Sequence, residues 1–475
     1  MEKLFKLKQN GTTVRTELVA GLTTFMTMAY IIALNPNLLT GFGSAGGPAL
    51  WNGVFMATCI ASAIGMFVMA FAANKPFAMA PGMGLNSFFA VVVGNIVGIT
   101  GMAYLEAYQA ALVIILVEGV LFLVLSLFRV REKIVECIPL GVRLGIAPAI
   151  GLMLMNIGFG SNAGVYDATG NANYVMKDFF GALTPSVISD KLGDSYRAMV
   201  LTVVTMLIGL LIIVILAIRK VKGAVLIGML GASVINWAGQ YIFLDTNPFA
   251  GLKTASFTPP VGDMMDTTFF KFNFSGLMEI GWFTVITLVI TFCLIDMFDT
   301  IGTLVGTASR AGMVDEKGNM PKMKEALLAD AVGTVTGACT GTSTVTTFVE
   351  SASGVEAGGR TGLTALTTGV LFLACMFIAP IAAIIPPAAT SAALIYVGIL
   401  MLMGLKKVAF DDIEQMVPVC LMLLAMPISG SIGHAIGLGL ISYTFIKVFN
   451  GKFKEVHWLT YVISAIFLVK FFLIV

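Results

Sequence analysis

Two carboxylates lie three residues apart in an almost wholly apolar stretch, "TFCLIDMFDTIGTLVG" at residues 291–306. In a helix, Asp296 and Asp299 would occupy positions i and i+3, which share one face, so both side chains can reach the same cavity. A carboxyl group held away from water can carry a proton and can also accept a hydrogen bond from a ligand N–H. The pair therefore predicts a proton-coupled binding site.

Other polar residues extend this candidate site. Glu350, in "TTFVES", is expected to bind ligand as Asp299 does, whereas Asp330, in "KEALLADAVG", suits a bracing or gating role. Asp296 could equally brace a neighbouring helix. Asn86 and Phe88 follow the Gly-rich break in "APGMGLNSFFA". An aromatic face there could stack on a flat ligand, although core packing is the commoner role of a phenylalanine. The candidates for proton coupling are Asp299, Glu350, Asp296 and Asp330.

The composition indicates what surrounds these acids. Of the 475 residues, 58% are hydrophobic and 11% charged, whereas soluble domains average about 25% charged residues. Apolar runs such as "YQAALVIILVEGVLFLVLSLF" are long enough to cross a bilayer as helices. A charge at the bilayer centre costs about 2.5–3.5 kcal/mol, so acids kept there are expected to have a use. The chain is predicted to be an all-α polytopic membrane protein.

Charge and metal-binding residues exclude several partners. The net charge is +2 with basic residues scattered at helix ends, so no nucleic-acid partner is expected. The six cysteines form no CxxC pair and the two histidines are far apart, so no metal site is predicted.

About fourteen membrane segments are expected, at residues 17–40, 50–73, 80–95, 103–128, 139–158, 197–218, 222–244, 279–305, 325–342, 348–358, 362–386, 390–405, 413–449 and 457–475. The thirteenth is too long for one crossing and is predicted to break near Pro427. Lys and Arg in the short loops favour a cytoplasmic N-terminus in a cell-membrane protein. Loops 159–196 and 245–275 then lie outside, and Lys447, Lys452 and Lys454 disagree with the rule.

An internal repeat relates the two halves of the chain. "IPLGVRLGIAPAIGLMLM" at 138–155 and "IPPAATSAALIYVGILML" at 385–402 both begin with Ile-Pro and carry a Gly thirteen positions after the Ile. Aligning the fifth and twelfth segments gives seven segments per half. An odd number inverts the second half relative to the first, as in many secondary transporters.

The third and tenth segments hold equivalent places in this repeat, and both are too short to cross as helices. They are rich in Gly, Pro, Ser and Thr, which suits a short extended piece followed by a half-helix. Non-helical backbone in a membrane is tolerated where protein buries it or where it forms the wall of a cavity. The binding site is therefore expected between these two segments.

The motifs together resemble the nucleobase–cation symporters, in particular the AzgA-like purine permeases for adenine, guanine and hypoxanthine. The resemblance covers the whole chain and rests on "AGLTTFMTMAYIIALNP", "APGMGLNSFF", "IDMFDTIGTLVG" and "STVTTFVESASGVEAGGRTGLTA". It implies a uracil-permease-like fold of two inverted seven-span repeats, with a short β-strand in spans 3 and 10. It also implies a core domain (1–133 and 276–388) and a gate domain (134–275 and 389–475).

The same resemblance implies the site and the mode of transport. Related uracil permeases hold the base between an acid on span 8 and another on span 10. These match Asp299, with Thr303 as a second polar contact, and Glu350, with Phe348 beside it. Relatives carry histidine where this chain has Thr303, which argues against uracil or xanthine. The energy source would be the proton gradient, without a cofactor, and relatives suggest a homodimer.

Other functions remain as alternatives. A permease for uracil or xanthine, or an anion carrier with the same fold, would need a different central site, and the two acids oppose an anion. An intramembrane aspartyl protease would need its two aspartates on facing helices, whereas Asp296 and Asp299 share one. A channel would not accumulate its solute.

Overall fold

The computed structural model describes most of the chain, namely residues 2–41, 45–128, 137–160, 195–253, 255–310, 313, 320–429 and 432–473. Most of the expected external loop 159–196 lies outside these residues.

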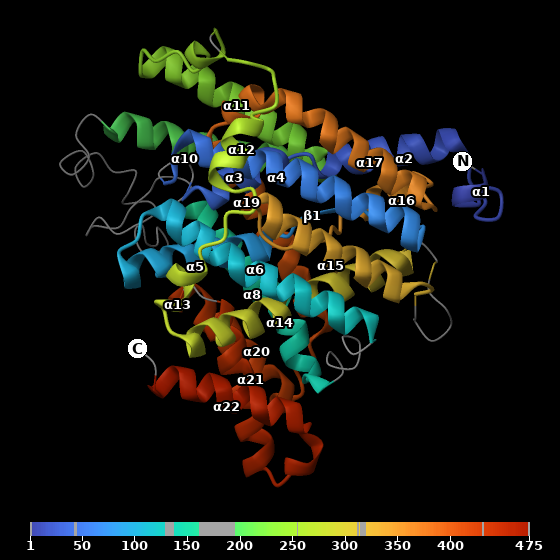
Figure 1. Cartoon of the computed structure of the whole chain (residues 1–475), viewed down its shortest axis with the longest axis vertical. Coiled ribbons are helices and arrows are strands. Elements are labelled where there is room, and N and C mark those ends of the chain that lie inside the picture. Colours follow the sequence, from blue (N-terminus) through green and yellow to red (C-terminus); the bar gives the residue numbers. More distant parts are fainter. Residues whose placement is uncertain are drawn as a thin grey trace.

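The first half of the chain runs through helices that lie side by side across the molecule (Figure 1). In chain order, its elements are α1 (Glu2–Phe5), α2 (Val14–Met28), α3 (Ile31–Leu39), α4 (Gly47–Val68), the π-helical turn η2 (Met69–Ala73), β1 (Met79–Pro81), α5 (Met83–Thr100), α6 (Tyr104–Leu127), α8 (Leu140–Phe159), α10 (Ser195–Ile218), α11 (Ala224–Phe243), η4 (Ala250–Lys253), α12 (Val261–Thr267) and α13 (Phe274–Met278).

The second half repeats this order of long helices around one short strand. Its elements are α14 (Trp282–Arg310), α15 (Met323–Thr340), β2 (Val345–Thr347), α16 (Ser351–Glu356), α17 (Gly362–Ala374), η5 (Cys375–Ile378), α18 (Ala379–Ala383), α19 (Pro387–Met401), η6 (Leu402–Lys407), α20 (Ile413–Ser429), α21 (Ile432–Phe449), η7 (Phe453–Glu455) and α22 (Trp458–Leu473).

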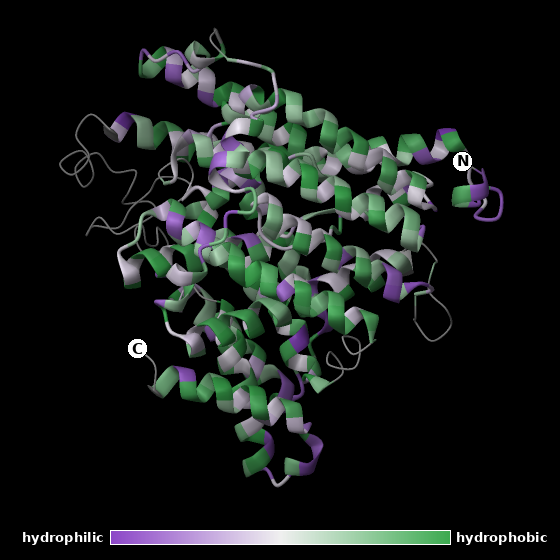
Figure 2. Cartoon of the chain, in the orientation of Figure 1, coloured by the Kyte–Doolittle hydropathy of each residue, from purple (hydrophilic) through white to green (hydrophobic). Residues whose placement is uncertain are grey.

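Membrane-spanning length is common among these helices. Within the described residues, 11 helices are long and apolar enough to cross a membrane, and apolar residues dominate the helices on view in Figure 2. The other expected segments are α15, which carries Lys, Glu and Asp, the broken tenth segment, and the shorter apolar helices α20 and α22. The third segment is longer than expected, because α5 continues to Thr100.

Helices from the two halves interleave. α15 packs against both α4 and α6, and α17 packs against α2 and α4. In a second group, α19 packs against α8, α10 and α11, while α20 packs against α8 and α21. Neither half therefore buries its apolar surface alone.

The predicted inverted repeat is visible where α8 crosses α19. A Cβ atom added to Gly151 would lie 2.5 Å from the carbonyl oxygen of Gly398, and one added to Gly398 would lie 2.6 Å from that of Gly151. These are the two glycines that the sequence repeat aligns. Such a reciprocal contact is expected where equivalent segments meet on a pseudo-two-fold axis. Each helix also begins just after an Ile-Pro pair, where proline suits a helix start.

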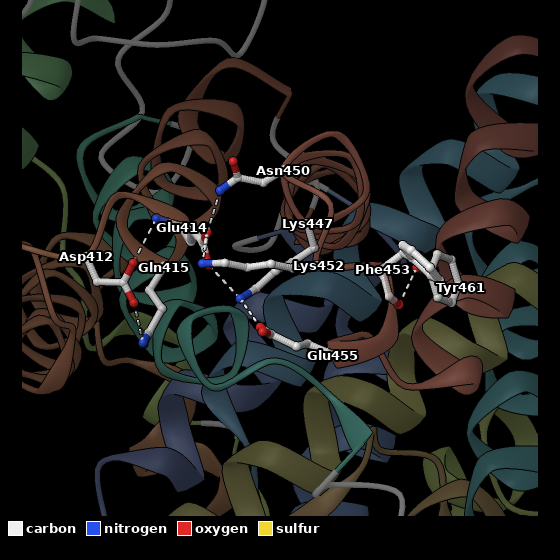
Figure 3. Close-up of polar contacts among 9 residues, drawn as sticks. All are labelled: Asp412, Glu414, Gln415, Lys447, Asn450, Lys452, Phe453, Glu455 and Tyr461. Atoms are coloured by element: carbon white, nitrogen blue, oxygen red, sulfur yellow. Dashed lines mark hydrogen bonds and ion pairs between the residues drawn. The ribbon is translucent and has the colours of Figure 1, made fainter.

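The expected thirteenth segment is two helices. It breaks after Pro427, as predicted, with α20 ending at Ser429 and α21 beginning at Ile432. Figure 3 shows that the start of α20 and the end of α21 meet, because Glu414 accepts from Lys447 at 2.5 Å and from Lys452 at 2.6 Å. α20 and α21 therefore form an antiparallel hairpin with both outer ends on one side.

Candidate functional site

The two short strands pair at the centre of the candidate site. β1 and β2 are antiparallel, with Ala80 opposite Thr346, and all six strand residues are buried. The pairing continues beyond the strands, because Gly82 N donates to Thr344 O at 3.1 Å and Phe348 N donates to Ala78 O at 3.0 Å. Each half thus satisfies the backbone that the other leaves open, as buried backbone requires in a membrane protein.

Asp299 faces this strand pair from α14. Its side chain is half-buried, and Thr346 Oγ1 donates to Asp299 Oδ2 at 3.4 Å. A Cβ atom on Gly82, at the start of α5, would lie 2.4 Å from Thr346 Cγ2 and 3.5 Å from Asp299 Oδ2. The missing side chain of Gly82 therefore lets α5 begin directly against the carboxylate. Thr303, one turn further along α14, is also half-buried.

Glu350 lies just beyond the other end of β2. It is half-buried at the start of α16 and accepts a hydrogen bond from the Tyr30 hydroxyl at 2.8 Å. Phe348, between β2 and Glu350, is 6% exposed. Asp299 lies close enough to Glu350 for the two charges to interact. The structure thus brings the acids of the eighth and tenth segments to one strand pair.

The side chains of Asn86 and Phe88 make contacts with other residues of the protein. Asn86 Nδ2 donates to Pro81 O at 3.2 Å and Asn86 Oδ1 accepts from Ser343, which ties the first turn of α5 to the residues before β2. Phe88 packs against Phe292 of α14, with 4.6 Å between ring centroids. Their direct contact with a ligand stays a prediction.

The remaining predicted acids lie deeper than Asp299. Asp296 and Asp330 are both 0% exposed, and Thr300 connects them. Thr300 Oγ1 is 2.9 Å from Asp296 Oδ1 and 2.8 Å from Asp330 Oδ1. This link joins α14 to α15.

Two residues of the site were not anticipated from the sequence. Tyr30 belongs to the first membrane segment, and only the fold brings it to Glu350. Glu118 on α6 is 0% exposed and accepts from Thr344 Oγ1 at 2.7 Å, which holds the residue before β2. Glu118 could have been recognised as a candidate from the sequence, because it is the single acid between Ala107 and Arg129 in a long apolar run.

Comparison with known proteins identifies the family. The profile of a permease family matches residues 15–436. The adenine permease AdeP of Escherichia coli is 37% identical over 99% of this chain and 95% of its own length. The guanine/hypoxanthine permease PbuO of Bacillus subtilis is 39% identical over 99% of this chain and 100% of its own.

A solved structure supports the fold independently. The transmembrane domain of the cyanobacterial bicarbonate transporter BicA superimposes with a TM-score of 0.60 at 15% identity. The match covers 87% of this chain and 96% of that domain. At 15% identity, this similarity to an anion transporter shows the fold and not the family. The sequence comparison decides the family, because it matches permeases along the full length of the chain. The chain therefore belongs to the nucleobase–cation symporter-2 family, an integral membrane family whose members are transporters and not enzymes.

Proposed function

We propose that the chain imports purine nucleobases, guanine or hypoxanthine and also adenine, together with protons. The observation that carries the proposal is the meeting of two half-buried acids, Asp299 and Glu350, at the strand pair between the halves. A purine is flat and presents several N–H donors, which suits two carboxylate acceptors beside an aromatic ring such as Phe348. Relatives named for adenine and for guanine/hypoxanthine support a purine as the substrate class.

In this proposal, the base binds beside the strand pair, between the third and tenth segments, and Thr303 supplies a second polar contact. Residues 1–133 and 276–388 move as a core domain against a gate domain of residues 134–275 and 389–475. The site then opens alternately to either side of the membrane. The proton gradient supplies the energy, no cofactor takes part, and two copies associate as a dimer.

The N-terminus is proposed to be cytoplasmic. The hairpin of α20 and α21 places Lys447 and Lys452 beside Glu414, close in sequence to Lys406 and Lys407. Two of the three lysines that disagreed with the orientation rule therefore lie beside the start of α20, which supports one basic side. A reporter enzyme active only in the cytoplasm, fused to the N-terminus, tests this orientation.

Uptake by cells lacking their own base permeases tests the substrate and the coupling. Radiolabelled hypoxanthine, guanine, adenine and uracil are supplied with and without a proton uncoupler. We expect at least one purine to accumulate, uracil to stay at background, and the uncoupler to abolish accumulation. If no base accumulates although the protein reaches the membrane, the purine assignment is wrong.

Tyr30→Phe tests the partner of Glu350. In the proposed site, the Tyr30 hydroxyl holds Glu350 in position for the base. Misplacing this acceptor would cost a hydrogen bond to a charged group, about 1.5 kcal/mol or more, so we expect the KM for the purine to rise roughly tenfold. Tyr104→Phe is the matched control, because that hydroxyl donates to the backbone oxygen of Leu39. An unchanged KM in Tyr30→Phe, measured by initial uptake rates, would remove Tyr30 from the site.

A further inference from the structure

Thr300 lies between two carboxyl groups in a way that its single proton cannot satisfy. Its oxygen is 2.9 Å from Asp296 Oδ1 and 2.8 Å from Asp330 Oδ1, and all three side chains are 0% exposed. A hydroxyl donates one hydrogen bond, and an ionised carboxylate can only accept. If both aspartates were ionised, one of these contacts would set an oxygen lone pair against another. Both contacts are hydrogen bonds only when one aspartate is protonated and donates to Thr300.

Two other threonines of α14, Thr287 and Thr291, bond differently from Thr300. Thr287 Oγ1 donates to Phe283 O and Thr291 Oγ1 donates to Thr287 O, both at 2.8 Å. This bond to the carbonyl one turn back is the usual arrangement for threonine within a helix. Thr300 instead turns its hydroxyl toward side chains on two helices.

We propose that Asp296, Thr300 and Asp330 form a proton-binding bridge, separate from the carboxyls that hold the base, and that this bridge carries the co-transported proton. That this proton is co-transported rests on the proposed function, whereas the sharing of the proton rests on the geometry alone. In one state, Asp296 donates to Thr300 and Thr300 donates to Asp330. In the other, the Asp296 proton passes to Thr300 as the Thr300 proton passes to Asp330. The number of protons and the net charge are the same in both.

The bridge can sense the base through Asp299. Asp299 directly precedes Thr300 in the chain, and its charge interacts with that of Asp330. Asp299 accepts an N–H of the base most strongly when it is ionised, and ionising it beside two charged aspartates is costly in a dry site. A proton on the bridge therefore favours base binding, and by reciprocity the bound base favours the proton.

Other acids and bases lie on the elements that pack against α14 and α15. Buried or half-buried acids and bases on the elements that contact α14 or α15 are Glu118, Arg143, Glu350, His434, Lys447 and Lys470. Of the two acids among them, Glu118 accepts from Thr344 and Glu350 accepts from Tyr30. Asp299 is therefore the acid best placed to connect the bridge with the base.

Infrared spectroscopy of the purified protein tests the shared proton without any transport. In Asp296→Asn, the amide N–H can donate to Thr300 while Asp330 stays ionised, so the bridge keeps its hydrogen bonds and loses its acidic proton. At neutral pH, we expect the wild-type spectrum to contain a carbonyl stretch of a protonated carboxyl group that is missing in Asp296→Asn. Asp263→Asn, on α12, is the control. Equal intensity in wild type and Asp296→Asn would overturn the proposal.

Transport in liposomes with an imposed pH gradient tests the coupling. Thr300→Val removes the bridging hydroxyl, so we expect labelled hypoxanthine only to equilibrate, as it does in wild type with an uncoupler. Thr300→Ser is expected to restore accumulation, and Thr291→Val, which loses only a backbone contact, is the matched control. Gradient-driven accumulation by Thr300→Val, or loss of simple base exchange along with accumulation, would overturn the proposal. Failure of the wild type to move any base would count against the proposed function, while the infrared result would stand.

Discussion

Asp299→Asn is expected to abolish purine accumulation while leaving the protein folded in the membrane. The amide has almost the shape of the carboxylate, so it can keep the contact with Thr346 Oγ1 and the space beside Gly82. It removes the negative charge that accepts the N–H of the base. A hydrogen bond to a charged group contributes about 1.5–3 kcal/mol, or roughly ten- to a hundredfold in affinity. Under the proposed coupling, accumulation would also be lost, because this charge connects the base with the proton.

Uptake of labelled hypoxanthine, normalised to the amount of protein in the membrane, measures this effect. Asp263→Asn makes the same chemical change at the acid that accepts from Asn52 at 2.6 Å, away from the strand pair, and is expected to keep wild-type uptake. Wild-type accumulation by Asp299→Asn would show that Asp299 does not hold the base.

Gly151→Val is expected to cause the largest loss of folded protein. A Cβ at this position would lie 2.5 Å from the Gly398 carbonyl oxygen and 3.0 Å from Met401 Cβ. Because the nearer atom is backbone, α19 as a whole would have to move. Adding even small groups to a packed interior typically costs about 1–3 kcal/mol, and valine adds three carbons here.

Thermal unfolding of the purified protein and its elution as a single species measure the loss. Gly94→Val is the matched control on another spanning helix, because a Cβ on Gly94 meets nothing within 4 Å. An unfolding temperature for Gly151→Val equal to that of Gly94→Val would show that α8 and α19 do not cross as closely as described.

The sequence predicted the broken segments and the repeat because both leave local signals. Proline, glycine and short polar residues are clustered in the third and tenth segments, and such clusters favour a break in a membrane helix, so the extended pieces near Pro81 and Val345 could be expected. The two Ile-Pro starts and the glycines after them revealed the repeat, whereas the crossing of α8 and α19 at those glycines came from the structure. The acids of the eighth segment were visible because charges are rare in apolar runs.

The partners of these acids could not be predicted, because they depend on contacts between distant parts of the chain. Tyr30 reaches Glu350 across 320 positions, and nothing near Tyr30 distinguishes it from an ordinary buried tyrosine. The position of Thr300 between Asp296 and Asp330 likewise needs α14 and α15 in place. The helix break after Pro427 was predicted. That the break brings Lys447 and Lys452 back to the start of α20 became clear only from their ion pairs with Glu414.

The crossing of Gly151 with Gly398 also bears on which way a solute moves. Two halves inserted upside down relative to each other offer a bound solute equivalent routes to either face of the membrane. The architecture then does not favour one direction of transport, and the gradients across the membrane determine the direction of net flux. In the proposed proton-coupled cycle, import and export are the same steps in opposite order, so the proton-motive force and the cell's consumption of the solute would set the direction.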